Sequence, residues 1–251
     1  MRKNLEVFSG FETARPQLEK IFEHFASEGI YVVEGKRNVI KKVAVNNEVY
    51  NIKKFKTPGL LQSLVYRYLR KSKAKRSFEY AKKLVSNEIN TPLPVAYCEF
   101  FSVGLRESYY VSKHLDYDFD FRVLIHQPKF PERTEILKQF TDFTYKLHEC
   151  NVNFLDHSPG NTLIVKKDKG IYDFFLIDLN RMRFETMSFE KRMHNFRRLW
   201  LSKTMMKIIS KRYAELHQKS YDEIYQRMMY HSRKFQKKIN SKKIRRRKRK
   251  A

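Results

Sequence analysis

The segment 154–178 limits the possible folds more than any other part of the chain. It begins with an Asp and an Asn five residues apart, Asp156 and Asn161, on either side of a Pro-Gly pair. Two short apolar runs follow, separated by Asp168-Lys169-Gly170, and Asp178 ends the second run. Short apolar runs on either side of a turn signal predict a β-hairpin. The sequence therefore predicts a polar loop that opens into a hairpin, which brings Asn161 and Asp178 together.

The hydrophobic period differs between the two halves of the chain. A first helix is expected at 13–28 and another at 76–89, with Glu79 on the second. Short apolar runs predict strands in the same half, at 31–33, 39–45, 49–55, 95–101 and 108–113. Beyond the hairpin region, helical spacing of apolar residues predicts helices at 132–150, 189–217 and 220–240. This order predicts a two-lobed α+β fold, with a small β-rich N-lobe, a mostly helical C-lobe and a hinge near residues 113–117.

The expected organisation has four parts. They are an N-terminal helix (1–30), an N-lobe (31–113), a C-lobe (114–232) and a basic tail (233–251) that we expect to be disordered.

The charge of the chain predicts a polyanionic neighbour. The net charge is +26, from 53 basic and 27 acidic residues, and the stretch 233–250 holds twelve Lys or Arg and no acid. Nucleic acid, an anionic membrane face and a phosphorylated glycan all fit this excess, and charge alone does not choose among them. Cys98 and Cys150 lie in no metal or redox spacing, and no apolar run approaches the ~20 residues that a membrane span needs. The N-terminus has no apolar stretch typical of a signal peptide, so we expect a soluble or peripheral intracellular protein.

Phosphoryl transfer gives the polar loop and hairpin a chemical reason. The transferred phosphoryl group carries dispersed negative charge, so catalysis depends mostly on positioning and neutralisation. An Asp near the acceptor hydroxyl, here Asp156, orients that hydroxyl and takes its proton. Mg²⁺ takes oxygen ligands, which Asn161 and Asp178 supply. Each residue alone has an ordinary structural explanation as a turn cap or strand end, but the three in this order favour a site.

These motifs resemble the catalytic and metal-binding elements of protein-kinase-like enzymes. The details are most similar to the lipopolysaccharide core kinases, the Kdo and heptose kinase family of Gram-negative bacteria. The resemblance covers roughly residues 30–200 and includes Tyr50-Asn51-Ile52-Lys53-Lys54-Phe55, Arg76-Ser77-Phe78-Glu79-Tyr80, Pro92-Leu93-Pro94-Val95-Ala96 and Leu147-His148-Glu149. It implies an ATP-dependent, Mg²⁺-dependent kinase that phosphorylates a sugar hydroxyl of Kdo or heptose in the lipopolysaccharide inner core.

The resemblance also implies site residues in the N-lobe. Ile52-Lys53 resembles the strand whose lysine contacts the ATP phosphates. Lys54 is the alternative, although strand alternation points it to the opposite face. Glu79 is the expected partner of Lys53, and Glu88 is a weaker alternative partner. The structural explanation of Glu79 is that it is an ordinary solvated residue on the surface of a helix. The adenine-reading hinge corresponds to Lys113, His114 and Leu115.

The sequence departs from the family of regulated protein kinases at several positions. The expected phosphate-covering loop has one glycine, in Glu34-Gly35-Lys36-Arg37-Asn38. Two alternatives stay open: Lys36 and Arg37 compensate for the missing glycines, or the loop is an ordinary β-turn. Leu155 replaces the Arg that serves control by activation-loop phosphorylation, and Asp178-Leu179-Asn180 replaces Asp-Phe-Gly. These departures favour a glycan or small-molecule acceptor over a protein acceptor.

Two basic segments bear on partners and location. The insert 56–75 combines Arg67, Arg70 and other cations with leucines and tyrosines, which suits an anionic membrane surface or a solvated helix. The tail suits membrane phosphates or RNA equally. We expect a lipid-linked glycan acceptor met at the cytoplasmic face of the inner membrane, with the protein cytoplasmic and peripheral there. Two alternatives stay open: a kinase-like enzyme acting on a ribosomal or RNA-associated protein, and a non-catalytic binding protein on a kinase scaffold.

Overall fold

The computed structural model describes residues 2–35 and 38–248 of the chain. They form two compact units, unit 1 (Met1–Asp116) and unit 2 (Tyr117–Ala251). The boundary falls within the hinge expected at 113–117. No helix of the described residues is long and apolar enough to cross a bilayer.

Unit 1 is built on one antiparallel sheet with the strand order β1-β5-β6-β4-β3-β2. Its strands are β1 (Arg2–Val7), β2 (Ile30–Glu34), β3 (Asn38–Val45), β4 (Glu48–Phe55), β5 (Pro94–Phe101) and β6 (Leu105–Lys113). Asn46 and Asn47 both have positive φ, 50° and 62°, as a tight hairpin turn between β3 and β4 requires. The five strands and the Asn-Asn turn expected from the sequence are therefore confirmed.

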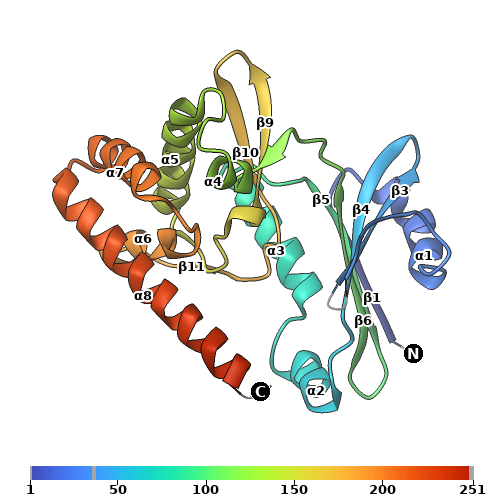
Figure 1. The fold of residues 1–251 in the computed structure, drawn as a ribbon. Helices are drawn as coiled ribbons and strands as arrows, with labels where there is room; N and C mark the ends of the chain where they lie inside the picture. The colour runs from blue at the N-terminus through green and yellow to red at the C-terminus, as the bar shows by residue number, and fades with distance from the viewer. Residues whose placement is uncertain (1, 36–37, 249–251) are drawn as a thin grey trace. The chain divides into compact units, whose positions relative to one another are not determined.

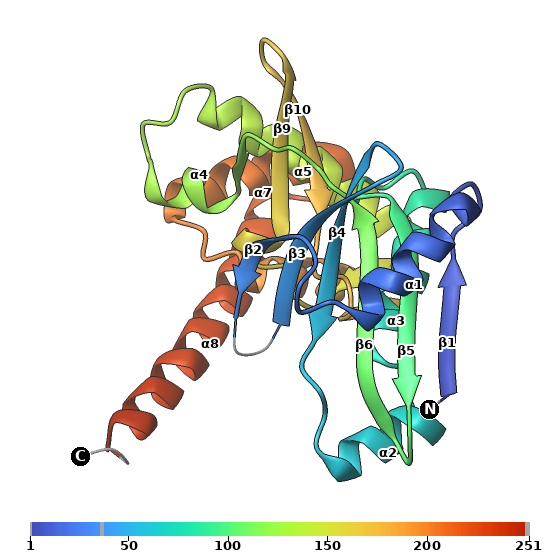
Figure 2. The same ribbon diagram turned by 90° about the vertical axis from the view of Figure 1, so that its right-hand side faces the viewer.

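Helices cover the two faces of this sheet (Figures 1 and 2). Helix α1 (Arg15–Glu23), with the short 3-10 helix η1 (Glu12–Ala14) before it, packs on one face. Helix α3 (Lys73–Ser86) packs on the other through Phe78, beside Phe55 and Tyr97. Because side chains alternate along a strand, neighbouring residues of β4 and β5 face different helices. This alternation decides which strand residues share a face with α3.

A buried lysine ties the end of α1 to the sheet. The Nζ atom of Lys41, on β3, donates to the backbone carbonyls of Phe25, Ala26 and Glu28 at 2.8, 2.8 and 2.7 Å. These carbonyls lie beyond the C-terminus of α1, where chain carbonyls lack helical donors. The Lys41 ammonium satisfies them, which explains how a charged side chain is tolerated at 1% exposure.

Strand β1 was not expected from the sequence. It pairs with β5 from Arg2↔Phe101 to Val7↔Ala96, so residues 2–7 are part of the same sheet as the later strands of unit 1. The strand is an edge strand with mixed charged and apolar residues. Edge strands commonly carry charges, which weakens the alternation by which strands are recognised in a sequence.

Helix α2 (Leu60–Tyr68) lies in the insert between β4 and α3. It packs by the turn between β5 and β6, where Ser63 is buried at 5% exposure. An added Cβ on Gly104 would lie 2.3 Å from Oγ of Ser63. Gly104 therefore permits the close approach that holds α2 against the turn.

Unit 2 is mostly helical. Its helices are α4 (Arg122–His126), α5 (Arg133–Glu149), α6 (Phe189–Asn195), the 3-10 helix η3 (Phe196–Arg198), α7 (Lys203–His217) and α8 (Tyr221–Lys248). Its small sheets comprise β7 (Phe119–Asp120) with the hairpin β9 (Thr162–Asp168) and β10 (Ile171–Leu176), and β8 (Val152–Phe154) with β11 (Met182–Phe184). The expected hairpin is thus confirmed.

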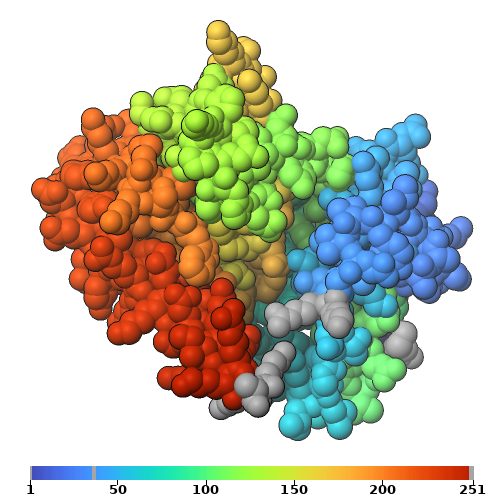
Figure 3. Space-filling model, in the orientation of Figure 1, coloured from blue at the N-terminus to red at the C-terminus, as the bar shows by residue number. Residues whose placement is uncertain are grey.

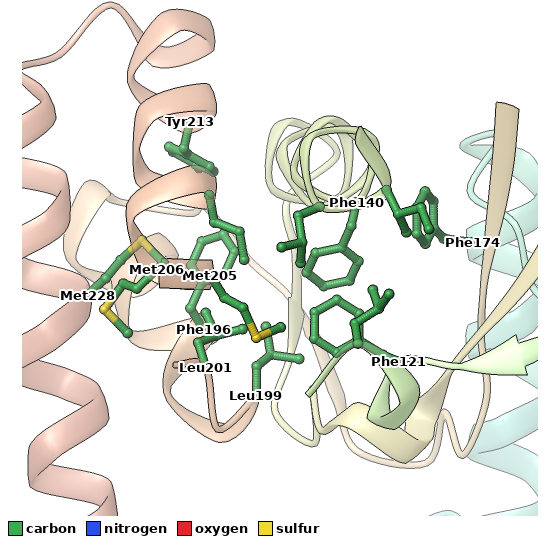
Figure 4. Packing of buried hydrophobic residues seen from close by; sticks show 14 of the residues in the cluster. Phe121, Phe140, Phe174, Phe196, Leu199, Leu201, Met205, Met206, Tyr213 and Met228 are labelled. Carbon is green, nitrogen blue, oxygen red and sulfur yellow. The ribbon is translucent and has the colours of Figure 1, made fainter. Parts of the chain in front are cut away.

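One apolar core joins the helices of unit 2 (Figure 4). Phe140 of α5 stacks near Phe121, with ring centroids 4.4 Å apart, and Phe196 meets Tyr213 of α7 edge-on at 5.6 Å. Met205 and Met228 extend the same cluster toward α8. This core fixes η3 and the hairpin, which both carry residues of the candidate site.

The helix expected at 189–217 is divided. Trp200 has a left-handed backbone with φ of 56°, which interrupts the helix after η3. Ser202 then caps α7 by accepting a hydrogen bond from the Met205 amide at 3.2 Å. Arg198 is the last residue of η3, just before the interruption, and its side chain is part of the candidate site.

The basic tail differs from the disordered segment that we expected. Helix α8 continues to Lys248, with Asp222 and Glu223 in its first turn and basic residues in its last. This charge distribution complements the helix macrodipole. Lys, Arg and Gln are also good helix formers. Residues 249–251 lie outside the described residues.

Candidate active site

The loop that carries Asp156 is closed by its own side chains. It runs from the end of β8 to the 3-10 turn η2 (Pro159–Asn161), which leads into β9. The Asn161 side chain donates from Nδ2 to the Asp156 backbone carbonyl at 2.9 Å. The Asn161 amide donates to Ser158 O at the same distance. Asp156 and Asn161, five residues apart in sequence, are therefore held together directly.

The hairpin brings Asp178 next to this loop in unit 2. Leu176 pairs with Thr162 at the end of the ladder, and the Ile177 amide donates to Asn161 O at 3.0 Å. Asp178 follows at once, with φ of 58°. Asn180 Nδ2 donates to Asp178 Oδ1 at 2.7 Å. A left-handed backbone at a non-glycine residue costs roughly 1–3 kcal/mol and is concentrated at functional sites.

Two arginines contact the Asp156 carboxylate. Arg198 Nη2 lies 2.7 Å from Oδ1, and Arg181 Nη1 lies 3.3 Å from Oδ2. The Asp156 side chain is 16% exposed, so the carboxylate is mostly shielded but open on one side. The pair of guanidinium groups contacts both carboxylate oxygens and fixes the orientation of the carboxylate. Sequence reasoning did not identify either arginine, because both are remote in sequence and join the site only through β11 and η3.

The buried side chain of His157 connects the Asp156 loop to α6. His157 Nδ1 lies 2.8 Å from Asn195 Oδ1, and Asn195 Nδ2 donates to Phe154 O at 3.0 Å. Burial lowers the pKa of His157 from 6.5 to about 4, so the ring is neutral near pH 7. The loop is thereby bonded to α6 without adding charge beside Asp156. His157 could have been noticed from its place after Asp156, whereas Asn195 gave no sequence signal.

Lys53 and Lys54 of β4 point to opposite faces of the sheet in unit 1. Lys54 Nζ lies 2.6 Å from Glu107 Oε1 and 5.3 Å from the centroid of the Tyr109 ring, on the α1 side. Lys53 Nζ lies 5.2 Å from the centroid of the Phe55 ring, and Phe55 packs with Phe78 of α3. Lys53 therefore shares the α3 face, whereas Lys54 has a structural role on the other.

Glu79 lies on α3, but its carboxylate is engaged by a different lysine from the one expected. Lys71 Nζ lies 2.8 Å from both Oε1 and Oε2 of Glu79. Glu79 therefore has a partner in the insert, and its expected pair with Lys53 stays a prediction. Glu88, the weaker alternative, lies just beyond the end of α3, with φ of 53°.

Of the three hinge residues, Lys113 is the last residue of β6, and His114 and Leu115 follow it. The Lys113 amide donates to Leu93 O and the His114 amide to Val49 O, both at 2.8 Å. Lys113 Nζ pairs with Glu48 at 2.7 Å, and His114 Nδ1 lies 3.1 Å from Asn51 Oδ1. The backbone amides of Lys113 and His114 are therefore engaged within unit 1.

Lys36, expected to approach the phosphates, lies outside the described residues, as does Arg37. Of the neighbouring described residues, Gly35 donates its backbone amide to Asn38 O at 3.2 Å.

The residues of the hairpin end fit a hard divalent cation. Asn161 uses its Nδ2 as a donor to Asp156, so its amide oxygen is directed away from that bond. Asp178 adds carboxylate oxygens, and amide and carboxylate oxygens are the donors that Mg²⁺ accepts. No group of three or more His, Cys, Asp or Glu side chains suited to a metal occurs in the described part of the chain. A site of one amide and one carboxylate leaves positions for water and phosphate oxygens, as Mg²⁺ requires.

Unit 1 is β-rich and carries Lys53 on the α3 face of a central strand. Unit 2 is helical and carries the loop with Asp156 and Asn161 and the hairpin that ends at Asp178. This combination is typical of a phosphotransferase of the protein-kinase-like class. A model of the lipopolysaccharide kinase (Kdo/WaaP) family matches residues 28–221. The chain belongs to this family.

Comparison with solved structures agrees on the fold. The structure of WaaP in complex with acyl carrier protein superposes with a TM-score of 0.66, covering 94% of this chain and 99% of that chain. The two sequences are 17% identical, so this likeness concerns the fold. A search of curated proteins found no match. Family membership makes the protein an ATP-using kinase that phosphorylates a sugar hydroxyl of a glycolipid in lipopolysaccharide core biosynthesis.

Proposed function

We propose that the acceptor is a Kdo or heptose hydroxyl of the inner core and that Asp156 is the catalytic base. The observation that carries this assignment is the direct bond from Asn161 to the backbone of Asp156, at 2.9 Å. This hydrogen bond joins Asp156, which would orient the acceptor, to Asn161, whose amide oxygen is a suitable metal ligand.

Asp156 would accept the proton of the sugar hydroxyl as the phosphoryl group is transferred. Arg198 and Arg181 hold the carboxylate on both oxygens, which restricts its rotation. A base held in one orientation contributes through proximity as well as through proton transfer. The same arginines are suited to stabilise negative charge that develops on the transferred group.

Asn161 and Asp178 would hold Mg²⁺, which supplies neutralisation of the phosphate charge when bound. Their oxygen donors support this assignment. The left-handed backbone of Asp178, with φ of 58°, directs the residue away from the strand path at that point. Asn180 restrains the Asp178 carboxylate from one side at 2.7 Å.

Lys53 would contact the ATP phosphates, and Lys36 would assist from the preceding turn. The α3 face on which Lys53 lies supports Lys53 over Lys54, because Lys54 is committed to Glu107. Glu79 would exchange Lys71 for Lys53 when nucleotide binds. Leu115 would contact the adenine through its backbone, with Lys113 and His114 holding the strand that positions it.

The protein would act at an anionic membrane surface, at the cytoplasmic face of the inner membrane. The insert 56–75 and the basic end of α8 would contact lipid phosphates. Arg245, Arg246 and Arg247 lie in the last turns of α8 and are exposed. Basic residues near an anionic surface contribute about 1 kcal/mol each. A surface of this charge would keep the enzyme beside a lipid-linked acceptor.

The experiment that tests the acceptor is mass spectrometry of lipid A–core from cells with and without the gene. We expect an inner-core Kdo or heptose to lose one phosphate in its absence, and the fragment masses to identify the sugar. Complementation with Asp156→Asn should not restore the phosphate, while complementation with Lys54→Met should. An unchanged glycolipid in the deletion strain would contradict the acceptor assignment.

A further inference from the structure

A basic cavity lies within unit 1, away from Lys53. It has a volume of about 410 Å³ and lies where the end of α2 and the start of α3 meet β1 and β5. Five basic side chains line it, and a single acidic residue, Glu99, contributes to the wall. The basic residues are Arg2, Arg67, Arg70, Lys71 and Lys75. Its volume is in the range of small-molecule sites.

Most of this positive charge is not balanced inside the protein. Lys71 is paired with Glu79 at 2.8 Å, but Arg2, Arg70 and Lys75 form no ion pair with any residue that the structure describes. Glu99 is 3% exposed and accepts a hydrogen bond from Asn4 Nδ2 at 3.0 Å. Several like charges around one cavity repel each other, so a bound anion stabilises them. The cavity is therefore suited to an anionic ligand.

The start of α3 adds to this potential. Ser72 caps the helix, with its Oγ accepting from the Lys75 amide at 3.1 Å, and Lys71 and Lys75 on either side of the cap line the cavity. The positive end of the helix dipole lies at this terminus and favours an anion. Side chains from β1, β5, α2 and α3 thus line the same space, beside the N-terminus of α3.

Exposed apolar side chains line part of the basic cavity and continue along α2. Tyr68 and Leu69 line it and are 69% and 83% exposed, and Leu60 and Leu61 of α2 are 72% and 83% exposed. Helix α2, cyan in the space-filling view, lies at the surface (Figure 3). Because Ser63 holds α2 against Gly104, these leucines are not needed to dock the helix. Cations next to exposed leucines suit a ligand that is both anionic and apolar.

We propose that this cavity binds the phosphate monoester headgroup of a membrane lipid, with the exposed leucines of α2 entering the acyl region. A monoester carries about −1.5 to −2 charges near neutral pH and three acceptor oxygens, which matches converging Arg and Lys donors better than a diester does. The site is separate from Lys53, which lies on β4, with β6 between β4 and β5. The inference rests on the membrane contact of the proposed function, and not on phosphoryl transfer.

The test is co-sedimentation of the full chain with phosphatidylcholine vesicles that contain phosphatidic acid or phosphatidylglycerol, at matched surface charge. We expect about tenfold tighter binding to phosphatidic acid, equivalent to ~1.4 kcal/mol. The Arg2→Ser/Arg70→Ser variant should lose this preference. The matched control, Arg15→Ser/Lys20→Ser, removes the same charge from α1 on the other face of the sheet and should keep it. Both pairs lie at exposed positions, so the fold should survive.

Soluble glycerol 3-phosphate separates the phosphate site from the apolar contact. Calorimetric titration should show binding to the wild type and to Leu61→Ser/Leu69→Ser, but not to Arg2→Ser/Arg70→Ser. The leucine variant should bind phosphatidic-acid vesicles more weakly than the wild type. Binding of glycerol 3-phosphate without any binding to phosphatidic-acid vesicles would overturn the lipid assignment.

Two further outcomes separate this inference from the function on which it rests. The cavity assignment is overturned if the wild type binds both kinds of anionic vesicle equally. It is also overturned if Arg2→Ser/Arg70→Ser and Arg15→Ser/Lys20→Ser reduce binding to phosphatidic-acid vesicles equally. In either case diffuse charge explains the binding. If the wild type binds no anionic vesicle, the membrane contact and the cavity assignment both fail, while phosphorylation of the glycolipid is tested separately by mass spectrometry.

Discussion

Asn161 donates its side-chain Nδ2 to the backbone carbonyl of Asp156 at 2.9 Å. The bond joins the two ends of the loop between β8 and β9 and fixes the direction of the Asn161 amide oxygen. Two variants separate its two roles. Asn161→Asp keeps an oxygen donor for a metal but lacks the N–H donor to Asp156, whereas Asn161→Ala lacks both.

We expect both Asn161 variants to lower kcat, and only Asn161→Ala to need much more Mg²⁺ for half-maximal rate. Removing a buried hydrogen bond costs about 0.5–1.5 kcal/mol, so the loop should stay folded in each. Steady-state kinetics over a Mg²⁺ titration measures the difference. Equal Mg²⁺ requirements in the wild type and Asn161→Ala would remove Asn161 from the metal site.

Asp156→Asn should lower kcat by about a hundredfold to ten-thousandfold, which is the usual contribution of a general base. The asparagine is isosteric but cannot take the hydroxyl proton. ATP binding, measured by calorimetry, should persist, because the proposed nucleotide contacts lie elsewhere. Turnover at the wild-type rate would show that another group acts as the base.

Lys53→Met and Lys54→Met compare adjacent residues on opposite faces of β4. Lys53→Met should reduce kcat/KM for ATP strongly, because Lys53 is assigned to the phosphates. Lys54→Met should keep kcat/KM but lower the free energy of unfolding by about 0.5–1 kcal/mol, through loss of the Glu107 pair and the Tyr109 contact. The reverse pattern would assign the phosphate contact to Lys54.

Acidification should destabilise the protein through its buried histidines. Burial lowers the pKa of His157 from 6.5 to about 4 and that of His148 from 6.5 to about 3. Below pH 6.5 the unfolded chain protonates these rings while the folded chain does not, so the free energy of unfolding falls as the pH falls toward the folded pKa values.

The histidine effect is measurable by urea unfolding across this pH window. Each ring contributes a slope of up to about 1.4 kcal/mol per pH unit. His157→Gln removes one titrating ring, so the plot of unfolding free energy against pH should become shallower by up to about 1.4 kcal/mol per pH unit. This change in slope is expected whatever the effect of the substitution on stability at neutral pH. An unchanged slope would mean that His157 is protonated in the folded state.

Removing the end of α8 should separate membrane binding from folding. The buried residues of the helix end at Ser232, and Phe235 is a later contact, with its ring 5.5 Å from the Arg198 guanidinium. A chain that ends after Lys238 should therefore unfold at nearly the wild-type temperature. Its binding to phosphatidylglycerol vesicles should weaken, because the last basic turns are gone. A large fall in the melting temperature would give these turns a structural role.

The sequence by itself determined the two-unit α+β plan, and it predicted the central residues of the candidate site in unit 2. The alternation in β3 and β4, the Asn46-Asn47 turn and the stripe of α5 are local patterns, and local patterns survive into the structure when burial agrees with them. Asp156, Asn161 and Asp178 could be found because a short loop and a hairpin place them with few intervening residues. The choice of Lys53 over Lys54 came from the resemblance of Ile52-Lys53 to the kinase strand whose lysine contacts ATP, and strand alternation predicted that Lys54 lies on the opposite face.

Only the tertiary structure decided which distant side chains join these residues. Arg198 and Asn195 reach the Asp156 loop through the packing of η3 and α6, and Lys71 reaches Glu79 because α2 and the start of α3 fold back. Strand β1 pairs with β5 from almost a hundred residues away, and its charged edge gave no clear period. The basic cavity has the same origin, since Arg2 and Arg70 become neighbours only when the sheet edge meets the insert. Long-range contacts of this kind depend on the whole packed chain and leave no local signal in sequence.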